Sequence, residues 1–251
     1  MHDRDRPFAK VPQVTAAFWI IKILATTLGE TAGDAVTMTL GLGYLVGSAI
    51  FGTMLVVLVG GQLRARRFHP LLYWATIIAS TTAGTTLADF ATRSLGIGYA
   101  GGSLLLLASV IVALAGWHAA TGTIAVESVH EPRAELFYWI TITLSQTLGT
   151  ALGDWLADDG GLGYLGAAVL FGAALLVLAI LYRTTALSRI ALFWLAFILT
   201  RPLGATVGDA LDKPRDHGGL DLSRPLASLV LVVAILVLIL MLPQRAERRA
   251  A

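Results

Sequence analysis

The feature that most constrains this chain is a pattern that recurs four times along its 251 residues. Each copy has a tryptophan, then a glycine ten positions later and an aspartate fifteen positions later. The tryptophans are Trp19, Trp74, Trp139 and Trp194. The glycines are Gly29, Gly84, Gly149 and Gly204, and the aspartates are Asp34, Asp89, Asp154 and Asp209. The tryptophans are 55, 65 and 55 residues apart, which favours duplication of a pair that was itself a duplication.

Composition places these repeats in a membrane. Hydrophobic residues make up 56% of the chain and charged residues only 14%, about half of the ~25% that is usual in soluble domains. Each repeat contains a motif-bearing helix, a glycine-rich turn and a plain apolar helix, and the apolar runs approach the ~20 residues that span a bilayer. We therefore predict an all-α polytopic membrane protein with eight transmembrane helices. The expected spans are 14–38, 43–62, 70–92, 98–120, 135–157, 162–182, 189–211 and 225–243. A single membrane domain would cover residues 1–251, with repeats at 14–62, 70–120, 135–182 and 189–243.

The distribution of lysine and arginine predicts the orientation. One group of positive residues should be cytoplasmic, because cytoplasmic loops are enriched in Lys and Arg. That group is Arg4, Arg6, Lys10, Arg64, Arg66, Arg67, Arg133, Arg183, Arg189, Arg245, Arg248 and Arg249. The opposite side would carry Arg93, Lys213, Arg215 and Arg224. Both termini are then expected in the cytoplasm, and all four repeats run in parallel rather than inverted orientation.

Polar residues follow one stripe of each motif helix. Positions 3, 7, 11 and 15, counted from the tryptophan, stack on one face of a helix. In the first repeat these positions hold Lys22, Thr26, Glu30 and Asp34. The other repeats contribute Thr81, Thr85 and Asp89, then Gln146, Thr150 and Asp154, and then Arg201 and Asp209. The motif helices are therefore expected to face inward.

Carboxylates within a membrane are costly and usually face a bundle interior or a wet cavity. We interpret Glu30 and Asp34 as the best candidates for cation binding or translocation. Secondary candidates are Asp89, Asp154 and Asp209, with Thr26 and Thr81 on the same stripe. Lys22 and Arg201 would be internal counter-charges. Five carboxylates against these two cations leave three formal negative charges, which suits a bound cation or held protons; the alternative is that burial keeps some of the acids neutral.

Structural interpretations stand beside the functional ones. Each aspartate lies late in its helix, where it could sit near the interface, fix the turn or pair with Lys22 or Arg201. The motif glycines are typical of close helix packing. The tryptophans are typical of an aromatic belt at the membrane interface.

Several classes of function are disfavoured. The absence of cysteine excludes disulfides and thiolate metal sites. The net charge is only +2 without a basic face, so nucleic-acid binding is not expected. No catalytic constellation is evident, and we predict neither an enzyme nor a cofactor. A metal site, of unknown identity, would be built from oxygen ligands and would suit hard ions.

The motifs Thr26–Asp34, Thr81–Asp89, Gln146–Asp154 and Arg201–Asp209, each preceded by its tryptophan, resemble a known bacterial family. It is the "repeat of unknown function 347" family, often labelled uncharacterised membrane-anchored protein. The resemblance covers nearly the whole chain and implies four tandem repeats of two transmembrane segments in a bacterial cytoplasmic (inner) membrane. It implies no established activity. The fourth repeat departs most, with Pro202 and a longer outer loop.

The leading functional hypothesis is a transporter or channel for a small cation, either a hard metal ion or a proton-coupled one. The alternative is a non-transporting membrane scaffold or partner subunit. A membrane enzyme acting on lipid is a third, weaker option. A transport path predicts water access along the stripe, whereas a scaffold predicts a dry stripe with each carboxylate paired. The expected partners are the lipid bilayer and, for the transport hypothesis, a small cation.

Overall fold

The computed structural model describes residues 9–248, and the described chain contains eight long helices and no strand. The all-α prediction is confirmed. The helices are α1 (Ala16–Asp34), α2 (Gly43–Arg64), α3 (Pro70–Asp89), α4 (Tyr99–Thr121), α5 (Pro132–Asp154), α6 (Gly163–Thr184), α7 (Arg189–Asp212) and α8 (Arg224–Met241). Most of these bounds lie within about three residues of the predicted spans.

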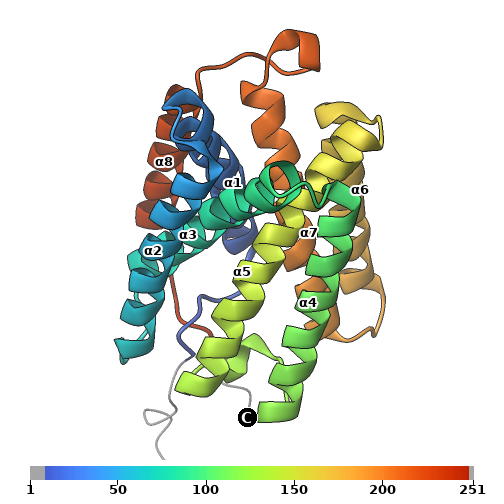
Figure 1. The fold of residues 1–251 in the computed structure, drawn as a ribbon. Coiled ribbons are helices and arrows are strands. Elements are labelled where there is room, and N and C mark those ends of the chain that lie inside the picture. The colour runs from blue at the N-terminus through green and yellow to red at the C-terminus, as the bar shows by residue number, and fades with distance from the viewer. Residues whose placement is uncertain (1–8, 249–251) are drawn as a thin grey trace, which may run out of the picture.

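Figure 1 shows the bundle from the side, and the helix contacts divide it into an inner ring and an outer ring. The four motif helices close the inner ring, because α1 packs on α3, α3 on α5, α5 on α7, and α7 on α1. Each outer helix packs mainly on the motif helix of the next repeat: α2 on α3, α4 on α5, α6 on α7, and α8 on α1. The contacts therefore follow a cyclic order, and the four repeats are related by a pseudo-fourfold axis through the centre.

The outer surface is suited to lipid. Among the described residues, five helices are long and apolar enough to cross a membrane: α2, α4, α6, α7 and α8. Exposed aliphatic side chains such as Val56, Val169 and Leu240 cover the outer ring. The other inner helices, α1, α3 and α5, carry their polar residues toward the axis, which lowers their mean hydropathy without exposing those residues to lipid.

The motif glycines allow the inner helices to approach closely. A methyl group added at Gly29 would strike the Thr81 side chain, and one at Gly204 would strike Thr26. The same relation holds between Gly84 and Gln146, and between Gly149 and Arg201. Each glycine ten residues after the tryptophan thus lies against position 7 of the neighbouring motif helix. Packing is the role that the spacing predicted for these glycines.

Wider helical turns and left-handed glycines join the two helices in the first three repeats. A π-helical segment follows each motif aspartate, at Ala35–Thr39, Phe90–Ser94 and Trp155–Asp159. The turn that follows holds two glycines with positive φ, for example 67° at Gly41 and 74° at Gly43, where a side chain would be strained. The fourth repeat lacks both features and has a longer loop after α7.

The tryptophans lie at one end of the inner ring, which we call the aromatic end. Each follows another aromatic residue: Phe18, Tyr73, Tyr138 or Phe193. Every one of these contacts its own tryptophan and the next tryptophan around the axis, with ring centroids 5.1–6.2 Å apart, so eight rings form a closed circuit. The Tyr73 and Tyr138 hydroxyls are 2.6 Å apart inside it. Trp74, Trp139 and Trp194 are buried, so their interpretation as a lipid-facing belt is wrong, because packing between repeats fills their surroundings.

The chain ends cover the aromatic end. Segment 9–13 pairs with segment 245–247 through backbone hydrogen bonds, and Ala9 and Val11 are buried. The Lys10 ammonium lies 2.7 Å from Glu135 and also donates to the carbonyl oxygens of Gln62 and Leu63 at the end of α2. This end of the axis is therefore closed. Arg4, Arg6 and Arg249, which entered the topology prediction, lie outside the described residues.

Candidate functional site on the bundle axis

The polar stripe of each motif helix faces the centre of the bundle and is buried. The axis can be described as layers, each defined by a position counted from the tryptophan. Position 15 is the layer of Asp34, Asp89, Asp154 and Asp209, and we call this side the acidic end. Position 11 contains Glu30, Thr85, Thr150 and Ala205, and position 7 contains Thr26, Thr81, Gln146 and Arg201. Position 3 contains Lys22 with three apolar residues. All of these side chains are almost inaccessible in this state.

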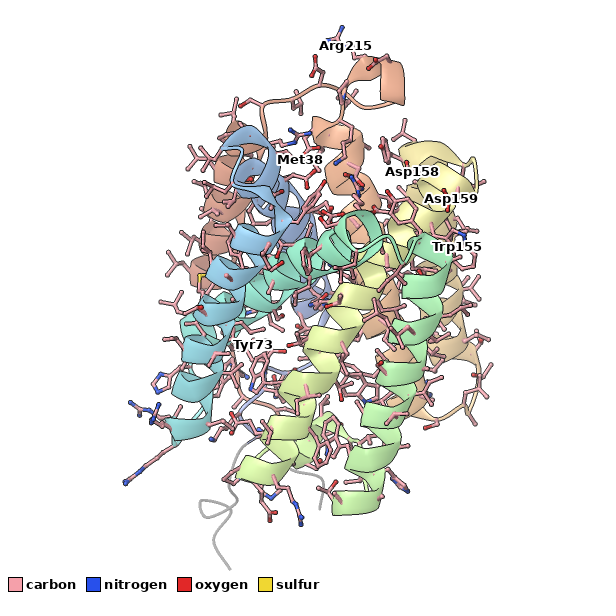
Figure 2. The ribbon with its side chains drawn as sticks, in the orientation of Figure 1. Met38, Tyr73, Trp155, Asp158, Asp159 and Arg215 are labelled. Atoms are coloured by element: carbon pink, nitrogen blue, oxygen red, sulfur yellow. The ribbon has the colours of Figure 1, made fainter. Side chains whose placement is uncertain are left out.

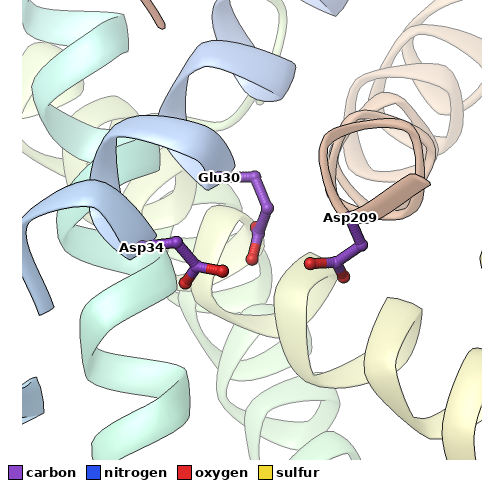
Figure 3. Close-up of side chains that lie close together, drawn as sticks. All are labelled: Glu30, Asp34 and Asp209. Carbon is purple, nitrogen blue, oxygen red and sulfur yellow. The ribbon is translucent and has the colours of Figure 1, made fainter. Parts of the chain in front are cut away.

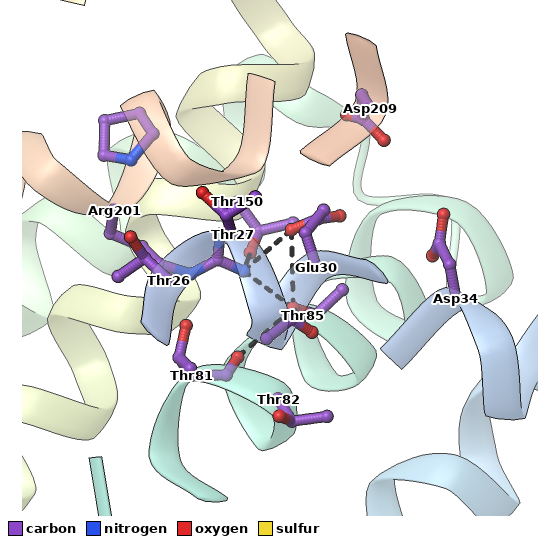
Figure 4. A network of polar contacts seen from close by, with 12 residues as sticks. Thr26, Thr27, Glu30, Asp34, Thr81, Thr82, Thr85, Thr150, Arg201 and Asp209 are labelled. Atoms are coloured by element: carbon purple, nitrogen blue, oxygen red, sulfur yellow. Dashed lines mark hydrogen bonds and ion pairs between the residues drawn. The ribbon is translucent and has the colours of Figure 1, made fainter. Parts of the chain in front are cut away.

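Arg201 crosses the axis and binds all three other motif helices (Figure 4). Its Nη2 atom donates to Glu30 Oε2 at 2.8 Å, to Thr85 Oγ1 at 2.6 Å and to Thr150 Oγ1 at 2.5 Å. Thr85 also donates to the Gly29 carbonyl oxygen at 3.1 Å. The Arg201 guanidinium thus connects the motif helices of all four repeats at the middle of the bundle.

Three carboxylates meet between α1 and α7 at the acidic end. Oxygen atoms of Glu30, Asp34 and Asp209 all lie within 4.8 Å of one another, and Figure 3 shows the three groups turned toward a common centre. The Lys213 ammonium lies 2.5 Å from Asp34 Oδ2 and 3.1 Å from Asp209 Oδ1. Burial alone would lower the pKa of Lys213, but Asp209 and Asp34 outweigh it and hold that pKa well above its ordinary value. The protonated Lys213 side chain therefore occupies the position that a bound cation would take between Asp34 and Asp209.

The opposite pair of repeats has a matching bridge. Arg93 Nε lies 3.0 Å from Asp89 Oδ1, and Arg93 Nη2 lies 3.1 Å from Asp154 Oδ2. Arg93 and Lys213 each stand four residues after their own aspartate, and each also binds the aspartate of the next repeat. The first and third repeats have Met38 and Asp158 at this position, both at the acidic end (Figure 2). The acidic end thus follows a twofold rather than a fourfold pattern, as duplication of a pair would produce.

The predicted surplus of three negative charges on the axis falls to one, because Arg93 and Lys213 each bridge two aspartates and add two positive charges. The sequence predicts both on the outer side, just beyond the ends of their helices. The sequence spacing indicates these two ion pairs, because a cationic residue four positions after a carboxylate lies on the same helical face. Asp212 was also missed; it is buried, with Arg224 Nε 3.5 Å from its Oδ2 atom. The loop beyond α7 cannot be aligned with the other repeats, which hid this contact.

The two predicted counter-charges behave differently. Arg201 pairs with Glu30, whereas Lys22 has no carboxylate within ion-pair distance among residues 9–248. Its Nζ donates to Thr200 Oγ1 at 3.2 Å and lies 4.1 Å from the centre of the Phe197 ring. Lys22 is therefore a buried cation supported by a hydroxyl and an aromatic face.

The threonines of position 7 contribute little to the carboxylate cluster. Thr26 donates to the carbonyl oxygens of Ile23 and Thr200, which couples α1 to α7. Thr81 Oγ1 is buried and has no hydrogen-bond partner among the described atoms. Neither hydroxyl lies in the group of Glu30, Asp34 and Asp209, which sits one to two turns nearer the acidic end.

The carboxylate cluster has the chemistry of a hard-cation site. It offers three buried oxygen donors, and Asp34 Oδ1 is buried without a hydrogen-bond partner. Ions such as Mg²⁺, Mn²⁺, Ca²⁺ or Na⁺ prefer oxygen ligands of this kind. Binding would require Lys213 to leave, because its ammonium now contacts two of the three carboxylates.

A lateral groove of about 670 Å³ opens on the side of the bundle between α1, α6 and α7. Its lining is mainly apolar and includes Trp19, Ile23 and Phe193. The lining also includes Thr200, the residue whose hydroxyl accepts from Lys22. It approaches the axis from the side and does not join the carboxylate cluster.

Comparison with known proteins gives a family match over four segments. The model described as "Repeat of Unknown Function (DUF347)" matches residues 17–68, 72–123, 137–186 and 192–246. Each matched segment contains one motif helix and the outer helix that follows it. No curated protein and no solved structure matches the chain.

Proposed function

Because the chain belongs to the DUF347 family of repeat proteins, whose description states no activity, we propose a function from the geometry of the axis: a carrier for a small hard cation. The observation that carries this proposal is the meeting of Glu30, Asp34 and Asp209, with the Lys213 ammonium bound to the last two. Carboxylates are expensive to bury, and here three of them converge, two of them on one ammonium group.

In this proposal, Lys213 is a built-in competitor of the transported ion. An incoming cation would displace the ammonium from Asp34 and Asp209. When that cation leaves, the ammonium would return to the two carboxylates. Lys213 stands just beyond the end of α7, so a change in the loop that follows can move it without unfolding a helix. The exchange keeps a positive charge beside the buried carboxylates in both states, which lowers the cost of emptying the site.

Closure at both ends is consistent with an occluded state of a carrier. The aromatic circuit and the paired chain ends cover one end, and the aspartate layer is buried at the other. A carrier needs such a state between its two open ones, whereas an open channel would show a continuous wet path. We further propose a location in the bacterial inner membrane, with the aromatic end and both termini in the cytoplasm, from the positive-residue bias.

The scaffold is the second candidate, and a specific observation favours it. Every axial carboxylate has a cationic partner: Arg201 for Glu30, Lys213 for Asp34 and Asp209, and Arg93 for Asp89 and Asp154. An axis on which every carboxylate is paired is what a scaffold requires. The carrier proposal requires that a transported cation can replace Lys213 beside Asp34 and Asp209.

Cation flux tests the proposal directly. Purified protein in liposomes would be offered Mn²⁺, Mg²⁺, Ca²⁺ and Na⁺, each with a fluorescent or isotopic reporter. We expect uptake of at least one ion by the wild type and loss of that uptake in Asp34→Asn, which keeps the side-chain shape and leaves Asp209 to hold Lys213. Asp221→Asn, in the exposed loop, is the control and should transport normally. Wild-type liposomes without flux, or full activity in Asp34→Asn, would refute the carrier.

A further inference from the structure

The half of the axis nearer the aromatic end carries more positive charge than its surroundings balance. Lys22 and Arg201 are both fully buried, and Glu30 is the one carboxylate that either of them contacts among the described residues. One formal positive charge is therefore left without an opposite charge in a low-dielectric interior. An isolated buried charge costs far more than a buried ion pair.

The same region contains buried polar atoms that lack partners. Nε and Nη1 of Arg201 have no hydrogen-bond acceptor, because only Nη2 serves Glu30 and the two threonines. Both ends of the Gln146 amide and the Thr81 hydroxyl are also unpartnered and fully buried. Buried side-chain polar atoms are usually hydrogen-bonded, so a group of unpartnered ones indicates a missing occupant.

These atoms belong to adjacent layers. Position 7 holds Arg201, Gln146 and Thr81. The Arg201 Nη2 atom reaches the position 11 side chains of the other three helices. The Arg201 side chain therefore runs from position 7 to position 11 and crosses the axis on the way. Lys22 stands one turn nearer the aromatic end, about 6 Å along the helix at 1.5 Å per residue. Its partner Thr200 precedes Arg201 directly in the chain.

We propose that a single monovalent anion of the halide class binds on the axis between Lys22 and Arg201, with the Gln146 amide nitrogen and the Thr81 hydroxyl as further donors. Water would satisfy the unpartnered donors but would leave the excess positive charge. A halide both satisfies the unpartnered donors and balances the excess positive charge, because it accepts hydrogen bonds and carries one negative charge. The site is separate from the carboxylate cluster and does not depend on cation transport.

Halide-dependent stability tests this site. The melting temperature of the purified protein would be measured at constant ionic strength in sodium gluconate with increasing chloride or bromide. We expect a saturating rise of several degrees in the wild type, since ligand that binds the folded state stabilises it. Arg133→Gln, an exposed arginine at the aromatic end, should show the same rise. Lys22→Met should show none, and in gluconate alone it should melt no lower than the wild type, because the unbalanced charge is gone.

Gln146→Leu gives a second test that leaves both cations in place. It removes one donor and should raise the halide concentration for half-maximal stabilisation several-fold. Bromide diffraction data should also place one anomalous peak between Lys22 and Arg201. A wild-type melting temperature that is the same in all salts would overturn the proposal, since water or an uncharged amine would then suffice. A halide effect unchanged in both variants would also overturn it, because binding would lie elsewhere.

Discussion

At the scale of single residues, the contact between Arg201 and Glu30 makes the largest predicted contribution to stability. Both groups are buried, so removing one charge strands the other. We expect Glu30→Gln to destabilise the protein by about 3–5 kcal/mol. Adding Arg201→Met should recover most of that loss, because an apolar side chain can replace a buried ion pair of similar volume. Thermal or denaturant unfolding in detergent measures both effects. Equal stability of wild type and Glu30→Gln would show that the pair does not hold the inner ring.

The sequence predicted the axial side chains well but not their pairing. The stripe of positions 7, 11 and 15 followed from helical periodicity alone, and the structure turns all of those side chains inward. Pairing depends on which helix is the neighbour, and one chain without its packing does not reveal that. Arg93 therefore looked like a loop residue, although it bridges two aspartates. The tryptophans looked like interface anchors for the same reason, because their aromatic neighbours come from other repeats.

At the scale of helices, the motif glycines are the points where inner helices touch. We predict that Gly84→Ala destabilises the protein by about 1–3 kcal/mol, because the new methyl group would lie 2.9 Å from the backbone of Gln146 and Thr147, which cannot rotate away. The matched control is Gly52→Ala in α2, where no atom lies within 4 Å. That change should be neutral or should stabilise by about 1 kcal/mol, since alanine favours a helix over glycine. The two melting temperatures decide the matter, and equal shifts would contradict the packing of the inner ring.

At the scale of the whole molecule, the repeats place the two ends of the bundle on opposite sides of a membrane. Arg66 and Arg133 are exposed at the aromatic end, and Asp159 and Arg215 are exposed at the acidic end. The chain has no native cysteine, so single cysteines at these sites can be probed one at a time. We expect an impermeant maleimide to label positions 159 and 215 in intact cells and to reach positions 66 and 133 only after the membrane is opened. The reverse pattern would invert the proposed orientation.

The exchange of Lys213 for a cation is the central claim, and the stability of Lys213→Met tests it most directly. Removing the ammonium leaves Asp209 buried without its cationic partner and leaves Asp34 with only Arg224, whose Nε lies 3.9 Å away. The variant should therefore melt well below the wild type when chelator has removed divalent ions. The account predicts that one of Mn²⁺, Mg²⁺, Ca²⁺ or Na⁺ restores its melting temperature. Arg93→Met is the matched control: it breaks the equivalent bridge, but positions 11 beside Asp89 and Asp154 hold Thr85 and Thr150 instead of a third carboxylate. It should be destabilised without rescue. A Lys213→Met protein that no cation restores, or equal rescue of Arg93→Met, would contradict the account and leave the scaffold in its place.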